Sequence, residues 1–312
     1  MLRALATGAL AIATPLLAAQ GASTKVVRLI VAFPPGGQSD LIARLVAQAL
    51  EEPLEVPVVV ENRSGASGQV GVEFAARAPA DGTTLLLGSA SNLTIAPALD
   101  SGLPYDTMRD FAPIGRVARL PLVVAVRAAL PVANARQLVD YARRHPGALT
   151  YASGAAMVQF AFESLNAQAG IDILHVPYGG SPPALRDLLA GVVDLILADV
   201  AAIAPHASSG AVRVIANAGQ TRSHAFPAIP TMVEQGYDFV FESWQGVLAP
   251  SGTPRESIAQ LQGALQKALA STEFRKGLEG VGAEPIDEPA AAFERLLRDE
   301  LEKYRRLVRI AK

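Results

Sequence analysis

The chain has 312 residues, half of them hydrophobic, and its 27 lysine and arginine residues nearly balance 29 aspartate and glutamate residues. With a formal net charge of −2 and no basic run, the sequence offers no electrostatic attraction to a phosphate backbone, which argues against nucleic-acid binding. Cysteine is absent, which excludes disulfides, thiolate metal sites and a lipid-modified cysteine.

Residues 1–22 have the pattern of a cleaved export signal. Arg3 supplies a basic start, residues 4–17 are almost wholly apolar, and small residues follow as far as Ala22. The apolar stretch is shorter than the roughly 20 residues that a membrane-spanning helix needs, which favours a cleaved signal over an uncleaved anchor. We therefore expect an exported, soluble mature protein.

Short apolar runs alternate with amphipathic helical patterns from residue 27 to residue 217. Strands are expected at 27–33, 56–61, 84–89, 122–127, 149–153, 173–178, 194–199 and 212–217, and helices at 40–50, 68–77, 135–144, 157–169 and 182–190. This alternation predicts an α/β fold in which helices cover both faces of parallel sheets.

The pattern changes after residue 221. Residues 222–237 are loop-like, residues 239–249 resemble one long strand, a capping box at 253–256 opens a helix, and a final helix begins near Pro289. Two α/β series followed by helices suggest a chain that builds one lobe, then a second, and then returns. We expect lobe 1 to comprise 23–121 and 247–312, lobe 2 to comprise 122–246, and a ligand cleft to lie between them.

The segment 33–40 is the most informative candidate for a binding loop. It follows the first strand and opens the first helix, and Gly36 and Gly37 allow a ligand to approach the backbone. Ser39 or Asp40 can cap the helix and leave other first-turn amides free for an anion. The alternative is an ordinary strand-to-helix turn.

Two further strand-to-helix loops are weaker candidates. Residues 151–157 could present amides from the second lobe across a cleft, although Ser-Gly is also common turn chemistry. Residues 65–71 fit no nucleotide-binding glycine motif and lack the lysine of a phosphate loop, so close packing around glycine is the favoured interpretation.

An enzyme is disfavoured by the sequence. The four histidines are scattered without metal-ligand spacing, and residues 88–92 fail the last position of a nucleophile elbow. Asp194 and Asp199 bracket a strand, but their separation places them on opposite faces and makes a shared acid–base role improbable.

Motifs throughout the chain resemble the Bug/TctC family, the periplasmic solute receptors of tripartite tricarboxylate transporters. They comprise residues 28–37 with Asp40, then 58–63, 79–83, 103–106, 110–113, 175–178, 243–244, 248–250, 252–254 and 282–285, all in the family's order. Each motif alone is weak, but the ordered set is specific.

The resemblance implies a two-lobed, type II periplasmic binding protein fold, each lobe a mainly parallel sheet flanked by helices. It implies capture of a small carboxylate in the periplasm without catalysis, cofactor or metal, by a monomer that serves two membrane subunits of a transporter. By the same resemblance, the first and second loops and the neighbouring pocket walls supply the ligand-binding residues Phe33, Gly37, Gln38, Ser39, Asp40, Ser89, Ser153, Gly154, Tyr178 and Asp199.

The second loop departs from the family pattern. Gln159 and Phe160 replace the usual His-Leu pair, and the preceding stretch is shorter and apolar, so it lacks hydroxyl donors. We therefore expect a ligand less polar than citrate, such as a monocarboxylate or an aromatic acid. A receptor that presents its ligand to a membrane kinase is the alternative function, since the same fold serves both roles.

Overall fold

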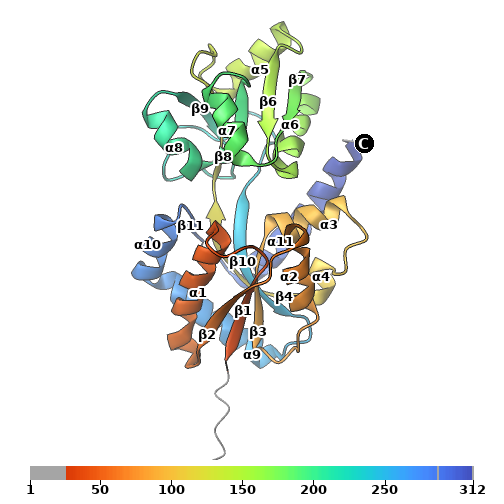
Figure 1. Ribbon diagram of the computed structural model, residues 1–312, viewed down its shortest axis with the longest axis vertical. Helices are drawn as coiled ribbons and strands as arrows, with labels where there is room; N and C mark the ends of the chain where they lie inside the picture. The colour runs from red at the N-terminus through yellow and green to blue at the C-terminus, as the bar shows by residue number, and fades with distance from the viewer. Residues whose placement is uncertain (1–25, 287, 311–312) are drawn as a thin grey trace, which may run out of the picture.

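A computed structural model describes residues 26–286 and 288–310. The predicted export signal lies outside the described residues. Two β-sheets, each flanked by helices, lie one above the other along the long axis of the molecule (Figure 1). The part built around the six-stranded sheet is called lobe 1 below, and the part built around the five-stranded sheet is called lobe 2.

The sheet of lobe 1 has the strand order β11-β4-β10-β3-β1-β2. Its strands are β1 (Val27–Val31), β2 (Val58–Asn62), β3 (Thr84–Ser89), β4 (Phe111–Leu120), β10 (Ser243–Pro250) and β11 (Glu284–Pro285). Strands β1, β2 and β3 are parallel, whereas β10 is antiparallel to β3 and β4, and β11 is antiparallel to β4. Leu29 and Ile30 of β1 are fully buried because helices cover both faces of the sheet.

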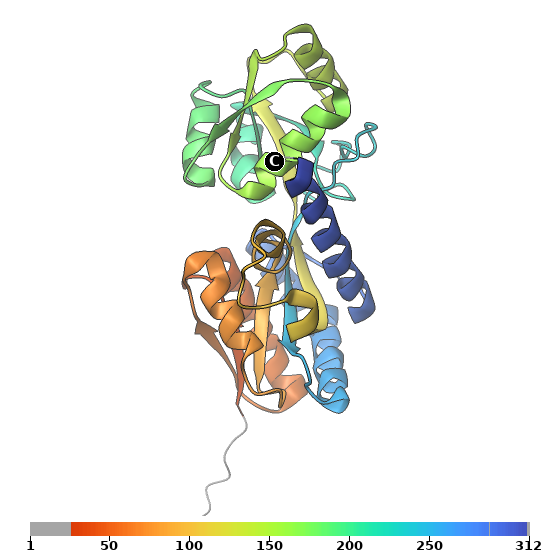
Figure 2. The ribbon, with the colours of Figure 1, turned by 90° about the vertical axis from the view of Figure 1, so that its right-hand side faces the viewer.

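The helices of lobe 1 are α1 (Gln38–Leu54), α2 (Gln69–Ala76), α3 (Ala96–Leu99), α4 (Thr107–Asp110), α9 (Arg255–Ala270), α10 (Thr272–Gly280) and α11 (Ala290–Ile310). A 3-10 turn at Ala66–Gly68 precedes α2, and a π-helical turn at Ser91–Ile95 precedes α3. Helices α1, α9 and α10 pack against one another. Helix α11 crosses β4 and continues toward lobe 2 (Figure 2).

The sheet of lobe 2 has the strand order β7-β6-β8-β5-β9. Its strands are β5 (Leu122–Arg127), β6 (Leu149–Ser153), β7 (Ile173–Pro177), β8 (Leu195–Asp199) and β9 (Val212–Asn217), and its helices are α5 (Ala135–Arg144), α6 (Ala156–Ala169), α7 (Ser181–Leu189) and α8 (Val200–Ser208). Strand β6 is parallel to β7 and β8, whereas β5 is antiparallel to β8 and β9.

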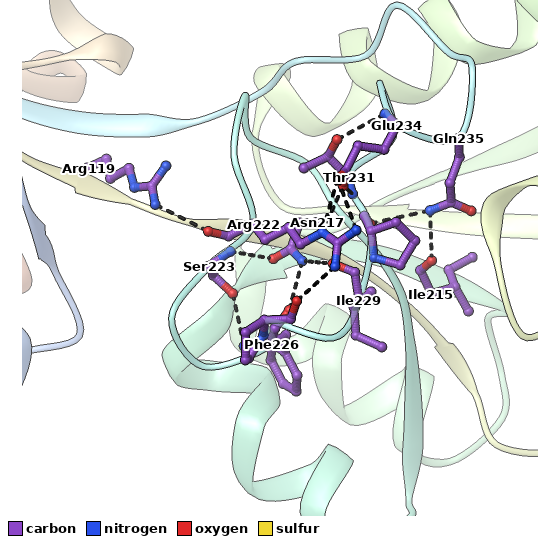
Figure 3. A network of polar contacts seen from close by, with 12 residues as sticks. Arg119, Ile215, Asn217, Arg222, Ser223, Phe226, Ile229, Thr231, Glu234 and Gln235 are labelled. Atoms are coloured by element: carbon purple, nitrogen blue, oxygen red, sulfur yellow. Dashed lines mark hydrogen bonds and ion pairs between the residues drawn. The ribbon is translucent and has the colours of Figure 1, made fainter.

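The return from lobe 2 to lobe 1 runs through residues 218–242, which the buried side chain of Asn217 holds in place (Figure 3). Its Nδ2 donates to the carbonyl oxygens of Phe226 at 3.1 Å and Ile229 at 2.6 Å, and its Oδ1 accepts from the N–H of Ser223 at 3.0 Å. The amide thus replaces the backbone pairing that a regular element would provide.

Aromatic side chains make the core continuous between the lobes at α11. Trp244 of β10 is fully buried and packs edge-on against Phe293 of α11, with ring centroids 5.2 Å apart. Farther along α11, the ring of Tyr304 lies 6.5 Å from Phe160 of α6 and 6.5 Å from Phe241. Trp244 is therefore a core residue.

The two-lobed α/β architecture is confirmed, but the sheets are mixed rather than mainly parallel. In each lobe only three strands form a parallel set, and the strands next to the crossings pair antiparallel. The reason is topological, because β4 leads out of lobe 1 directly into β5, and β10 re-enters it from lobe 2. The expected lobe boundaries at 121/122 and 246/247 stay a prediction.

Two local expectations were wrong. Residues 239–242 precede β10 rather than belonging to it. The capping box at 253–256 does not form, because the Thr253 hydroxyl donates to the carbonyl of Pro250 at 2.7 Å, and Pro254 is the N-cap of α9 without a side-chain hydrogen bond.

Candidate ligand-binding site

A cavity of about 440 Å³ lies where the two lobes meet. The carboxyl ends of β1 in lobe 1 and β6 in lobe 2 both point toward this level of the molecule (Figure 1). The lobe 1 side is formed by Ser67, Ala90, Ser91, Ile95, Ala96, Leu99 and Ser243, and the lobe 2 side by Leu122, Ala155, Ala156, Met157, Val158, Ser181, Leu197, Ala198 and Asp199. The walls are thus apolar with four hydroxyls and one carboxyl.

The helices of lobe 2 that reach the cavity begin without side-chain caps. Helix α6 starts after Ala155, and the first-turn N–H groups of Ala156 and Met157 have no acceptor within the described chain. Helix α8 starts after Asp199, again without a side-chain cap, and its Ala201 N–H has no acceptor there either. Uncapped helix N-termini combine free donors with the positive end of the helix dipole, which is an arrangement that attracts an anion.

Asp199 is the predicted site residue that lines the cavity. It ends β8 and is the N-cap of α8, and its side chain is half-buried. Burial raises the pKa of the Asp199 carboxyl above its usual value, opposed by a hydrogen bond with its own backbone. The resemblance named Asp199 as a neighbour of the pocket, and ligand contact by Asp199 stays a prediction.

Ser89 lies directly behind the cavity wall. It is buried at the end of β3, where its N–H donates to Oδ1 of Asn92 at 3.0 Å. Its hydroxyl lies 2.9 Å from the hydroxyl of Ser91, which lines the cavity. Ser89 therefore contacts a lining residue, while Ser91 faces the open space.

The first loop is held together by its own polar groups. The N-cap of α1 is Gly37, so the expected capping by Ser39 or Asp40 was wrong. Asp40 is buried and accepts instead from the N–H of Gly36 at 3.0 Å and from Arg44 at 3.0 Å. Burial alone would raise the pKa of the Asp40 carboxyl, but these hydrogen bonds together lower it. The N–H groups of Gln38, Ser39 and Asp40 have no acceptor among the described residues.

Three other residues of this loop contact lobe 1 itself. The backbone oxygen of Phe33 accepts from Asn62 at 3.1 Å, and the Gln38 side chain donates to the carbonyl of Val281 at 3.1 Å. The Ser39 hydroxyl accepts from Gln245 of β10 at 2.9 Å. These contacts fix the loop at the carboxyl end of β1, and ligand contact by Phe33, Gly37, Gln38, Ser39 and Asp40 stays a prediction.

The second loop places Ser153, Gly154 and Tyr178 around the β6–β7 edge. The buried Ser153 hydroxyl lies 2.5 Å from Nε2 of His175, and Tyr178 donates its hydroxyl to Asp187 at 2.7 Å. A Cβ on Gly154 would lie 2.3 Å from the backbone carbon of Gly180. Glycine therefore lets the loops before α6 and α7 meet, and ligand contact by these three residues also stays a prediction.

Four lining hydroxyls were missed from the sequence: Ser67, Ser91, Ser181 and Ser243. Ser181 followed a detectable signal, because it opens α7 after β7 and Gly179-Gly180, the same strand–glycine–helix order as the first loop. The loop before α2 was read as close packing, which is confirmed, since a Cβ on Gly71 would lie 2.7 Å from Cα of Ala32. That loop also brings Ser67 to the cavity.

Neither a metal centre nor a membrane span was found in the described part of the chain. No group of three or more histidine, aspartate or glutamate side chains among residues 26–286 and 288–310 could hold a metal ion. Over the same residues, no helix combines the length and the apolar character needed to cross a bilayer.

Comparison with known proteins identifies the family. The model of the tripartite tricarboxylate transporter family receptor, TctC, matches residues 42–311. The chain belongs to this receptor family. Protein BugT of Bordetella pertussis is 35% identical to it over 91% of this chain and 88% of its own length.

Solved structures of TctC receptors and their relatives share the fold. A TctC solute-binding protein from Polaromonas, without ligand, has a TM-score of 0.84 and 25% identity, covering 92% of this chain and 99% of its own. R. palustris Rpa4515 with adipate has a TM-score of 0.75 and 32% identity, covering 93% of this chain and 98% of its own. The resemblance noted in the sequence and the periplasmic binding protein fold are thereby confirmed.

Proposed function

We propose that this TctC receptor captures a small carboxylate between its lobes in the periplasm and delivers it to the two membrane subunits of a tripartite tricarboxylate-type transporter. In this proposal residues 1–22 direct export, the mature protein is a monomer, and capture requires neither catalysis nor a cofactor. The observation that carries it is the cavity between the lobes, onto which the uncapped start of α6 opens.

The cavity lining supplies hydrogen-bond donors for a bound carboxylate, but no cationic side chain. Ala156 and Met157 present free N–H groups, and the hydroxyls of Ser67, Ser91 and Ser181 can donate from both lobes. Backbone donors at a helix N-terminus stabilise a carboxylate and lose little entropy on binding because they are already positioned. The solved relative Rpa4515 holds adipate, a small carboxylate.

The apolar walls support a ligand less polar than citrate. The start of α6 contributes Ala155, Ala156, Met157 and Val158, and Gln159 does not enlarge the polar surface because its Nε2 donates to Glu163 at 2.7 Å. A tricarboxylate would place several desolvated charges against these side chains, which costs free energy unless each is paired. A monocarboxylate or aromatic acid avoids that cost.

A binding screen tests the proposal. The purified mature protein is titrated calorimetrically with citrate, adipate, hexanoate and benzoate, and with hexanamide and benzamide as uncharged controls of matched shape. We expect binding of at least one acid and none of its amide, with hexanoate or benzoate tighter than citrate. Equal binding of acid and amide, or no binding by any carboxylate, rejects carboxylate capture; tightest binding by citrate rejects only the less polar ligand.

A further inference from the structure

Asp199 is the one ionisable side chain among the residues that line the interlobe cavity. The other lining residues are apolar or carry a hydroxyl, so no arginine, lysine or histidine side chain of the lining set compensates its charge. A half-buried carboxylate beside apolar walls has lost part of its hydration, and it gains free energy from any donor that reaches it.

Asp199 also has no side-chain partner among the described residues, unlike Asp194 and Asp40. Asp194, at the opposite end of β8, is bound by Arg127 at 2.7 Å, and Asp40 is bound by Arg44 at 3.0 Å. The carboxyl of Asp199 interacts only with its own backbone. Because Asp199 lines the cavity, a bound molecule can use its remaining acceptor capacity.

The cavity therefore has two kinds of polar group, hydrogen-bond donors and one charged acceptor, and they suit different parts of a ligand. The first turn of α6 and the lining hydroxyls offer donors, which suit a carboxylate. Asp199 offers an acceptor, which suits a hydroxyl or ammonium group and opposes a second carboxylate by like charge. Apolar side chains, among them Ile95 and Leu197, line the rest of the wall and suit the hydrocarbon part of a ligand.

We propose that Asp199 makes this receptor selective for monocarboxylic acids that carry a second, hydrogen-bond-donating group, a hydroxyl or an amine, at the end remote from the carboxylate. The inference rests on the proposed function and narrows its ligand class. The donor of the ligand binds the free oxygens of Asp199, while the ligand carboxylate binds the N–H groups of Ala156 and Met157.

Two matched series of ligands test the selectivity. The first is hexanoate, 6-hydroxyhexanoate, 6-aminohexanoate and adipate; the second is benzoate, 4-hydroxybenzoate, 4-(aminomethyl)benzoate and terephthalate. Calorimetry on the mature protein at neutral pH should show a donor-bearing acid binding roughly 10-fold or more tighter than its parent and its diacid, the effect of one hydrogen bond to a charged acceptor. The hydroxyl and amine arms identify which donor is preferred.

Asp199→Asn is the decisive variant, because asparagine keeps the size and suits an N-cap position but removes the charge. We expect the preference for the donor-bearing acid to fall roughly 10-fold and the diacid to bind more tightly. Asp140→Asn, on an exposed part of α5 with a side chain 64% exposed, is the matched control and should change neither. Unchanged thermal unfolding in the absence of ligand separates these effects from misfolding.

The possible outcomes distinguish failure of the selectivity by Asp199 from failure of carboxylate capture itself. Carboxylates that bind without preference for a donor, or with the same preference in Asp199→Asn, overturn the inference and leave carboxylate capture intact. A diacid that binds tightest, and more tightly as the pH falls, overturns it too, because Asp199 would then be protonated and act as a donor. Failure of every acid to bind rejects the proposed function and the inference together.

Discussion

The guanidinium of Arg119 on β4 lies 2.6 Å from the carboxylate of Glu284 on β11, at the point where the chain leaves lobe 1. The same guanidinium donates to the carbonyl of Arg222 in the returning segment (Figure 3), and the other oxygen of Glu284 accepts from the N–H of His224 at 2.8 Å. The pair therefore connects lobe 1 to the returning segment, residues 218–242, which Asn217 of lobe 2 holds in place.

We predict that Glu284→Gln lowers the free energy of unfolding by about 2 kcal/mol, because it removes one of the two carboxylates that pair with the largely buried Arg119. The other, Glu242, still lies 3.4 Å from the guanidinium. The side chains of Arg119 and Glu284 are only 13% and 10% exposed, so water can compensate little for the loss of the ion pair. In a double-mutant cycle with Arg119→Met, measured by urea unfolding, the double variant should lose less than the sum of the single losses. Glu294→Gln, which breaks an exposed pair on α11, should cost less than about 1 kcal/mol. Additive losses would contradict direct coupling.

The close approach of two loops around Gly154 gives a second prediction. Alanine there would place its Cβ 2.3 Å from the backbone carbon of Gly180, so the loops must separate. We expect Gly154→Ala to cost about 1–3 kcal/mol, as overpacking does, and to weaken ligand binding because the start of α6 moves. Gly179→Ala is the control, since no heavy atom lies within 4 Å of its added Cβ. Thermal unfolding measures both, and equal melting temperatures would show that the loops yield without cost.

The buried carboxyl of Glu300 on α11 should make the stability of the fold depend on pH. It is buried, and one oxygen accepts from Trp244 at 3.0 Å and Thr94 at 2.8 Å. Burial raises the pKa of the Glu300 carboxyl despite these bonds. The folded state then holds the proton more tightly than the unfolded state, so this group stabilises the fold below its ordinary pKa and that contribution is lost as the pH rises through the folded-state pKa.

Glu300→Gln should remove this dependence, because the amide oxygen can accept both hydrogen bonds without a charge. Urea unfolding at pH 5 and pH 8 should show that the wild type loses more stability than the variant between the two. Glu294→Gln, on the same helix but exposed, should follow the wild type. A constant difference between wild type and Glu300→Gln at both pH values would show that Glu300 does not titrate in this range.

For elements with a regular apolar pattern, the sequence predicted the first and last residues correctly. Strands 84–89, 122–127, 149–153 and 212–217 and helix 135–144 have the observed bounds, because local periodicity and burial agree there. Strand β4 was missed because Pro113 and Gly115 resemble loop residues. The structure accommodates Pro113 at an irregularity in the β4–β10 register, where its missing N–H interrupts no regular ladder.

The site was predictable only in part, for a different reason. A strand that runs into a helix is visible in sequence, so the loops before α1 and α6 were found. Which side chains then reach a shared cavity depends on the lobes meeting, and Ser67 and Ser181 become neighbours of one space only in three dimensions. Helix α8, rich in alanine and interrupted by Pro205, was also missed, and with it the role of Asp199 as an N-cap.

The free N–H of Ala156 permits a direct test of anion binding by α6. Proline is tolerated at the first position of a helix, and Ala155 already has the extended backbone (φ −157°, ψ 152°) that a residue before proline requires. Ala156→Pro therefore removes one donor from the cavity and leaves the helix intact. We expect carboxylate affinity to fall roughly 10-fold, the effect of one hydrogen bond to a charged acceptor, with little change in melting temperature.

Thr272→Pro makes the same substitution at the first position of α10, after the extended Ser271 (φ −70°, ψ 126°) and away from the cavity lining. It should leave affinity unchanged, so a loss confined to Ala156→Pro assigns the effect to the missing N–H. Equal affinity in Ala156→Pro and wild type would show that the carboxylate does not bind the N–H of Ala156.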